Sequence, residues 1–101
     1  MLTKDEIMQL LSLNREKIRQ FGVKKIGLFG SYVTNKQSEH SDIDFLVEFY
    51  EDQKKFDNFM DLYFFLKDIF KCEIDLKTIK SLPKNRNFTK NVLKEVEYAT
   101  F

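Results

Sequence analysis

An alternation of apolar and polar residues fills positions 42–49 of the chain, Asp42-Ile43-Asp44-Phe45-Leu46-Val47-Glu48-Phe49. Because successive side chains of a strand point to opposite faces of a sheet, this pattern predicts a strand with Asp42 and Asp44 on the same side. Their Cβ atoms would lie about 7 Å apart, at a rise of about 3.3 Å per residue. Two such carboxylates can share divalent cations, although Asp-x-Asp also occurs by chance in acidic loops. Like charges opening an apolar strand are unfavourable unless a cation neutralises them, which favours a functional role.

Two further strands are predicted, one before and one after this segment. Residues 25–29 form a short apolar run that ends at Gly30-Ser31, as a buried strand entering a tight turn does. Residues 73–78 alternate again and place Asp75 on the polar face. Gly30 has no Cβ, so the backbone could approach a phosphate there, and Ser31 could hold the phosphate oxygens. A plain turn is the alternative for Gly-Ser, and a solvated strand position is the alternative for Asp75.

Three helices are predicted around these strands. The first spans residues 4–21, because a Thr-x-x-Glu capping box begins at Thr3 and Gly22 can adopt the left-handed backbone that ends a helix. The second covers residues 56–70, where apolar side chains recur at helical spacing. The third follows Pro83, and its apolar positions are Phe88, Val92, Leu93, Val96 and Ala99.

The order helix, strand, strand, helix, strand, helix predicts an α/β (α+β) fold, a small mixed β-sheet with helices packed on it, and excludes a helical bundle. A length of 101 residues suits one domain over residues 1–101. Seventeen basic and sixteen acidic residues give a net charge of +1, so neither direct nucleic-acid binding nor membrane binding is expected. Cys72 is the only cysteine and no apolar run approaches the ~18 residues of a membrane span, which favours the cytoplasm.

The spacing of these motifs resembles a known family. Residues 28–32, Leu-Phe-Gly-Ser-Tyr, and residues 41–47, Ser-Asp-Ile-Asp-Phe-Leu-Val, resemble the core signature of the polymerase-β-type nucleotidyltransferase superfamily, with ten residues between Ser31 and Asp42. The short length is similar to that of the minimal nucleotidyltransferases paired with HEPN proteins. The resemblance extends over nearly the whole chain and implies the nucleotidyltransferase fold.

The resemblance also implies an activity, which is Mg²⁺-dependent transfer of a nucleoside monophosphate, AMP from ATP, to a hydroxyl group. In the resembled subfamily the acceptor is a tyrosine of a cognate HEPN ribonuclease toxin, which would make this chain an antitoxin. Asp42 and Asp44 would hold two Mg²⁺ ions, and Asp75 would bind one of them and orient or deprotonate the hydroxyl. Gly30 and Ser31 would hold the β- and γ-phosphates. Such transfer needs positioning and charge neutralisation more than covalent help from the protein.

The chain departs from the family pattern after Gly30-Ser31. Thr34 stands where the family usually has an arginine, which would place a fixed cation near the phosphates. Nucleotide affinity and turnover are therefore expected to be lower, unless Lys36 or Lys77 substitutes for it; solvated surface lysines are the alternative reading of both. Asn35 replaces a glycine, and Asn tolerates left-handed backbone angles.

Two other functions stay open at this point. A catalytically weak binding module could neutralise a partner protein by masking its surface, and an apolar arc of Leu62, Phe65 and Ile69 beside the core stripe of residues 56–70 could supply the contact. Modification of a small molecule would use the same metal chemistry, but the chain shows no second domain to form an acceptor pocket. His40 in a polar loop is expected to be solvated, and Cys72 is expected to be a small buried side chain.

Overall fold

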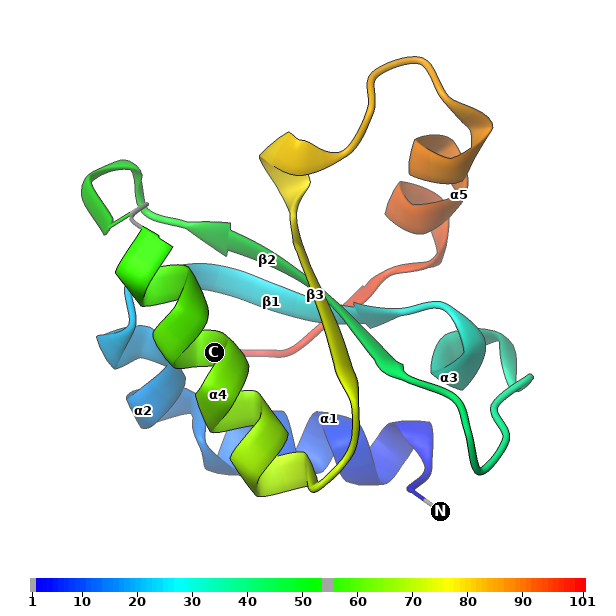
Figure 1. The fold of residues 1–101 in the computed structure, drawn as a ribbon, viewed down its shortest axis with the longest axis horizontal. Helices are drawn as coiled ribbons and strands as arrows, with labels where there is room; N and C mark the ends of the chain where they lie inside the picture. The colour runs from blue at the N-terminus through cyan, green and yellow to red at the C-terminus, as the bar shows by residue number, and fades with distance from the viewer. Residues whose placement is uncertain (1, 54–55) are drawn as a thin grey trace.

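The computed structural model describes residues 2–53 and 56–101, and these form a mixed sheet of four strands in the order β3-β2-β1-β4 (Figure 1). The strands are β1 (Val23–Phe29), β2 (Ile43–Phe49), β3 (Ile74–Thr78) and β4 (Glu97–Tyr98). Strand β1 is antiparallel to β2 and to β4, whereas β2 and β3 are parallel. The predicted mixed α/β architecture is confirmed.

The helices of the described residues are α1 (Lys4–Leu13), α2 (Arg15–Gln20), α3 (Ser31–Thr34), α4 (Phe56–Phe70) and α5 (Asn87–Glu95). Short 3₁₀ turns cover Glu51–Gln53 and Ile79–Ser81. Helix α4 makes the crossover that a parallel pair of strands requires, since it connects the end of β2 to the start of β3. None of the helices in the described part of the chain has the length and apolar character needed to cross a membrane.

The two faces of the sheet have different coverings. Figure 1 shows α1, α2 and α4 on one side of the sheet and α5 on the other. The face toward α1, α2 and α4 carries the buried side chains Ile26, Leu28, Ile43, Phe45, Val47, Ile74 and Leu76. The opposite face carries a smaller cluster of Phe29, Leu46, Leu82 and Val92. Helix α5 covers only part of this second face, so polar side chains on the uncovered part can reach solvent.

The first predicted helix is interrupted at Asn14. The Thr3–Glu6 capping box is present, and Gly22 has the expected positive φ of 85°. At Asn14, however, the side-chain amide donates to the carbonyl oxygen of Leu10 at 2.8 Å, and the backbone N–H bonds to the carbonyls of both Leu10 and Leu11. This local bonding ends α1, and α2 begins at the next residue.

The last predicted helix is too long. Helix α5 ends at Glu95, so Val96 and Ala99 lie outside it. The chain then forms the short strand β4, which the sequence pattern did not predict, and the Ala99 N–H donates to the Ile26 carbonyl at 2.9 Å. Pairing with the free edge of β1 satisfies backbone groups that a longer helix would leave exposed on that strand.

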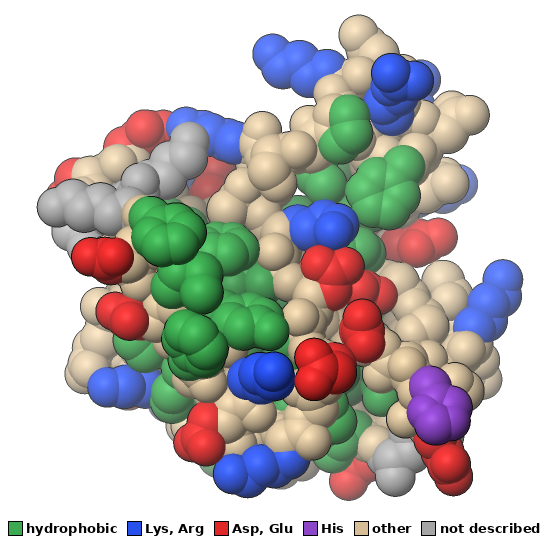
Figure 2. Space-filling model, viewed as in Figure 1, with side chains coloured by type: hydrophobic (Ala, Val, Ile, Leu, Met, Phe, Trp, Pro, Cys, Tyr) green, Lys and Arg blue, Asp and Glu red, His purple; other side chains and the backbone are tan. Residues whose placement is uncertain are grey.

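Helix α4 has the predicted bounds, but the arc of Leu62, Phe65 and Ile69 that was predicted as a contact surface packs against the core. Leu62 is fully buried in the core, and Phe65 packs against Phe21 with ring centroids 5.5 Å apart, so neither offers a free surface. The outward aromatic residues are Phe56, which is 76% exposed, and Phe64, which is 60% exposed. Figure 2 shows hydrophobic side chains gathered over α4 on the same face of the molecule that displays β3.

Candidate active site

The register of the central strands brings two predicted site residues together. Asp44 of β2 lies opposite Asp75 of β3 in the parallel ladder, and opposite Phe29 of β1 in the antiparallel ladder. Both carboxylates therefore lie on the partly covered face of the sheet. Asp42 is exposed and precedes β2, which begins at Ile43, so the prediction that Asp42 lies within the strand is wrong.

Gly30 follows β1 directly and lies against Asp44. A Cβ placed on Gly30 would collide with Oδ2 of Asp44, and the Gly30 backbone has a φ of 78° that favours glycine. Ser31 begins the single turn α3, in which the N–H groups of Val33 and Thr34 donate to the Gly30 carbonyl at 3.0 and 3.1 Å. The turn thereby holds the Gly30 backbone beside the carboxylate.

A cleft of about 380 Å³ opens at this point, between the sheet and α5. Its lining residues are Phe29, Gly30, Asp44, Asp75, Lys77, Phe88, Asn91, Val92 and Glu95. Three of the five predicted site residues, Gly30, Asp44 and Asp75, line it. Ser31 and Asp42 do not; Asp42 lines a separate hollow of about 530 Å³ beside Tyr32.

The electrostatics of the cleft depend mainly on Asp44. Burial, and after it the negative charges of Asp75 and Asp42, together raise the pKa of its carboxyl from 3.8 to about 6. A hydrogen bond between the Asp44 and Asp75 carboxyl groups acts in the same direction, whereas the Lys77 ammonium lowers the pKa.

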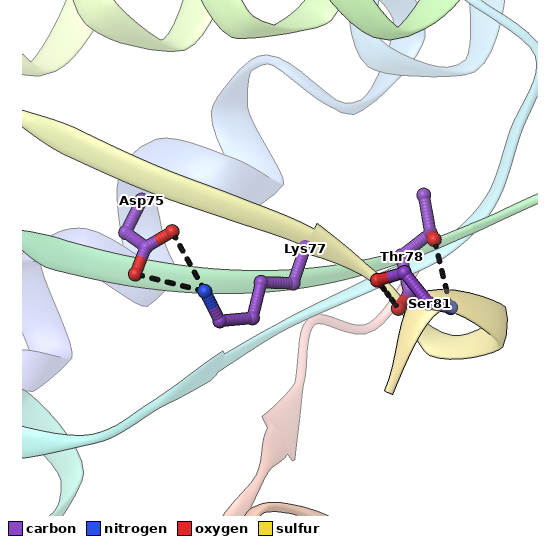
Figure 3. A network of polar contacts seen from close by, with 4 residues as sticks. All are labelled: Asp75, Lys77, Thr78 and Ser81. Atoms are coloured by element: carbon purple, nitrogen blue, oxygen red, sulfur yellow. Dashed lines mark hydrogen bonds and ion pairs between the residues drawn. The ribbon is translucent and has the colours of Figure 1, made fainter. Parts of the chain in front are cut away.

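Asp75 is held by an ion pair within its own strand. Lys77 Nζ lies 3.1 Å from Oδ1 and 3.2 Å from Oδ2 of Asp75, as Figure 3 shows. The two residues are two positions apart on β3, so their side chains leave the strand on the same face. Of the two lysines considered as substitutes for the missing arginine, Lys77 lines the cleft, whereas Lys36 is exposed beyond α3 and does not.

Asp44 and Asp75 could supply two protein ligands to a magnesium ion, but not a complete set of ligands around it. Within residues 2–53 and 56–101, no three His, Cys, Asp or Glu side chains converge closely enough to hold a metal ion. Mg²⁺ in phosphate-transferring enzymes is commonly held by one or two carboxylates together with water and substrate phosphates. Asp44 and Asp75 meet that requirement, because they are adjacent and their mutual repulsion would fall when a cation binds.

Helix α5 contributes residues to the cleft that the sequence analysis did not assign to a site. Phe88 was predicted as one of the apolar positions of the last helix; it is 49% exposed and lines the cleft with Asn91 and Glu95. The spacing of Phe88, Asn91 and Glu95, three and four residues apart, is the signal that could have placed them together on one side of a helix. Elsewhere His40 is exposed as predicted, and Cys72 is half-buried rather than fully buried.

Comparison with known proteins identifies the family. The model described as a nucleotidyltransferase domain matches residues 7–99. The chain belongs to this nucleotidyltransferase family. Among its relatives, the protein adenylyltransferase MntA of Thermococcus cleftensis is 38% identical to this nucleotidyltransferase over 99 residues, which cover 97% of each chain. The resemblance predicted from the residues around Gly30 and Asp44 is confirmed.

Two solved structures share the fold of this nucleotidyltransferase. A crystal structure of a toxin-antitoxin with AMP-PNP matches it with a TM-score of 0.68 at 24% identity, over 93% of this chain and 73% of the other. A tri-AMPylated Shewanella oneidensis HEPN toxin in complex with MNT antitoxin matches with a TM-score of 0.61 at 22% identity, over 92% of this chain and 73% of the other. At these identities the matches establish the common fold.

Proposed function

We propose that this nucleotidyltransferase transfers AMP from ATP to a tyrosine hydroxyl of a cognate HEPN ribonuclease toxin, and so acts as an antitoxin. The observation that carries the proposal is the pairing of Asp44 with Asp75 beside Gly30 in one cleft. Support comes from the relative named protein adenylyltransferase and from the fold shared with an antitoxin in complex with an AMPylated toxin.

The carboxylates would hold Mg²⁺, with Asp44 and Asp75 as the central pair and Asp42 completing the set. When bound, Mg²⁺ would neutralise phosphate charge and fix the phosphate oxygens relative to the acceptor. The Asp44 pKa of about 6 lets protonation compete with a cation at this position. The proposal also requires Asp42, which is exposed just before β2, to reach the same nucleotide as Asp44.

The chain's own residues have distinct tasks in the proposed transfer. Gly30 and Ser31, at the start of the turn that follows β1, receive the β- and γ-phosphates. The acceptor oxygen forms a bond to the α-phosphorus, and the bond from that phosphorus to the bridging oxygen breaks. Pyrophosphate leaves with the electron pair of that bond. Asp75 orients the acceptor hydroxyl and takes its proton, since Asp75 lies at the edge strand where an acceptor can enter.

The acceptor is expected to be a protein that brings its own recognition surface. The cleft of about 380 Å³ is smaller than many sites that hold two substrates, so it leaves little room beyond the nucleotide. The exposed aromatic side of α4, with Phe56 and Phe64, is the surface we assign to the partner. We place the reaction in the cytoplasm, where ATP is available and the single cysteine, Cys72, stays reduced.

Label transfer tests the function directly. The chain and the protein co-encoded with it are incubated with [α-³²P]ATP and Mg²⁺, and label on the partner is followed for the wild type and for Asp42→Ala plus Asp44→Ala. Loss of transfer is expected in the double variant, whereas Asp5→Ala plus Glu16→Ala, which removes two exposed carboxylates of α1 and α2, should leave it unchanged. Label transfer that survives the first double variant would overturn the proposal. A partner whose tyrosines are replaced by phenylalanine tests the acceptor.

A binding module remains the second candidate, favoured by Thr34 in place of an arginine and by the exposed rings on α4. In that case Asp42→Ala plus Asp44→Ala would still protect cells from the partner protein. Substitution of Phe64 would then abolish protection. The growth assay therefore separates masking from catalysis.

A further inference from the structure

Among the described residues that line the cleft, Lys77 is the one with a positively charged side chain. The lining includes three carboxylates, from Asp44, Asp75 and Glu95, and one ammonium group. A nucleoside triphosphate adds several negative charges to this already acidic site, so binding without a positive group would be opposed. Lys77 is the side chain within the described lining that can offset that repulsion.

We propose that Lys77 is a phosphate-positioning residue: its ammonium group, which pairs with Asp75, moves to the phosphate groups of the nucleotide when the nucleotide binds. The proposal rests on the proposed function, because it takes the cleft to be the ATP site. It assigns to Lys77 the fixed positive charge that an arginine at position 34 would otherwise supply.

The geometry supports this assignment in two ways. Lys77 Nζ contacts both oxygens of Asp75, at 3.1 and 3.2 Å, so it occupies the oxygens that a bound cation would need. A lysine ammonium on a flexible stem can exchange one set of oxygen partners for another, and phosphate oxygens are partners of the same kind. Release of Asp75 and engagement of the nucleotide would then be one movement.

The backbone of Lys77 is held in place, whereas its side chain reaches the partly exposed mouth of the cleft. The next residue, Thr78, accepts a hydrogen bond at Oγ1 from the Ser81 N–H at 3.2 Å, and Ser81 Oγ donates to the Thr78 carbonyl at 2.8 Å, which ends β3 in a tight turn (Figure 3). The Lys77 side chain is about one-third exposed. The backbone is therefore anchored on both sides of the residue, by the β2 ladder and by the turn.

Other lysines do not match this position. Lys80, three residues further along, makes an ion pair with Glu51 at 2.6 Å, outside the cleft. Lys36 is exposed in the loop after α3. Lys36→Met therefore provides a control that makes the same change in net charge without touching the cleft.

The test measures binding rather than turnover. Affinity for AMP-PNP with Mg²⁺ is determined by calorimetry for the wild type, Lys77→Met, Lys77→Gln, Lys77→Arg and Lys36→Met, with circular dichroism as a check of folding. Loss of a charge-assisted bond to phosphate predicts affinity weaker by about tenfold or more in Lys77→Met and Lys77→Gln. Lys77→Arg should retain most of the affinity, and Lys36→Met should match the wild type.

A second measurement shows the competition at Asp75. Mn²⁺ binding without nucleotide, followed by electron paramagnetic resonance, should become tighter by about threefold or more in Lys77→Met, because the ammonium no longer occupies both Asp75 oxygens. Opposite changes in metal and nucleotide affinity cannot come from general damage to the fold. If folded Lys77→Met and Lys77→Gln bind AMP-PNP as the wild type does, the inference is overturned and the proposed function stands. If the wild type does not bind AMP-PNP, both are overturned.

Discussion

Gly30 and Asp44 lie so close together that a Cβ on Gly30 would collide with the Oδ2 atom of Asp44. They come from opposite ends of adjacent antiparallel strands, since Gly30 follows β1 and Asp44 is the second residue of β2. The Gly30 φ of 78° is also one that residues with a Cβ rarely adopt. Glycine at position 30 thus lets the Asp44 carboxylate lie directly against the backbone.

Gly30→Ala is expected to impair both stability and activity. The unfavourable backbone angle alone costs about 1–3 kcal/mol of unfolding free energy. The added methyl group should also displace the Asp44 carboxylate and lower the rate of AMP transfer by on the order of tenfold or more. Urea denaturation and initial-rate measurements with the partner protein check the two effects.

A matched control for this variant is Gly27→Ala. A Cβ on Gly27 would crowd the side chains of Val96 and Tyr98 near β4, away from the carboxylates. Gly27→Ala should therefore lower the free energy of unfolding while the rate per folded molecule stays close to that of the wild type. A wild-type rate in Gly30→Ala would show that the close approach of Gly30 to Asp44 is not needed for transfer.

Asp44→Asn is expected to stabilise the metal-free chain at neutral pH. The pKa of Asp44 is raised by burial to about 6 in the fold, above its usual 3.8, so folding is favoured by protonation. That contribution is fully present below pH ~4 and is lost as the pH rises through about 6. The shift would correspond to about 3 kcal/mol, but the side chain is only half-buried, so screening reduces the expected gain in Asp44→Asn to about 1 kcal/mol at pH 7.

Urea denaturation in EDTA at pH 4 and at pH 7 checks this pH dependence. The difference between Asp44→Asn and the wild type should be near zero at pH 4 and should grow toward pH 7. Asp61→Asn, which changes an exposed carboxylate on α4, should show no such growth. A difference that is constant across this range would mean that the Asp44 pKa in the fold is not raised.

The side of the sheet on which Asp44 and Asp75 lie was predictable, because period-two alternation fixes which side each strand residue faces. Asp44 and Asp75 each had an apolar residue on either side, so both had to leave the core. Their direct opposition depends on the register of β2 and β3, which the sequence of neither strand contains by itself. The glycine at position 30 was predicted to free the backbone, but its contact with Asp44 became visible only in three dimensions.

The errors arose where one sequence pattern suits two structures. Val96 and Ala99 continue the helical spacing of α5, yet the unpaired edge of β1 was available to bond the backbone of residues 97–98. Asn14 fits an amphipathic helix by position, and its amide interrupts that helix by local hydrogen bonding. The apolar arc of α4 is so wide that spacing alone could not show which aromatic residues face the core.

Phe88 is expected to bind the nucleobase. Its ring is 49% exposed and lines the cleft, so a planar base can stack on it. Removing one stacked aromatic side chain costs on the order of 1–3 kcal/mol per base, which predicts AMP-PNP affinity weaker by at least about fivefold in Phe88→Ala. Phe88→Tyr keeps the ring and should bind as the wild type does. Leu93→Ala is the control, because Leu93 is as exposed as Phe88 on α5 but does not line the cleft. Equal losses of AMP-PNP affinity in Phe88→Ala and Leu93→Ala would contradict stacking.

Phe64 and Phe65 are adjacent on α4 but should respond differently to substitution. Phe64 is 60% exposed, so Phe64→Ser should change the free energy of unfolding by less than about 0.5 kcal/mol. Phe65 packs on Phe21 and the main core, so Phe65→Ser should lower the free energy of unfolding by about 2 kcal/mol.

If α4 contacts the partner protein, Phe64→Ser should weaken the complex by about tenfold, as for a central aromatic contact, while binding of AMP-PNP stays unchanged. Calorimetric titration with the partner checks this, and an unchanged dissociation constant in Phe64→Ser, with Phe56→Ser also unchanged, would place the interface elsewhere.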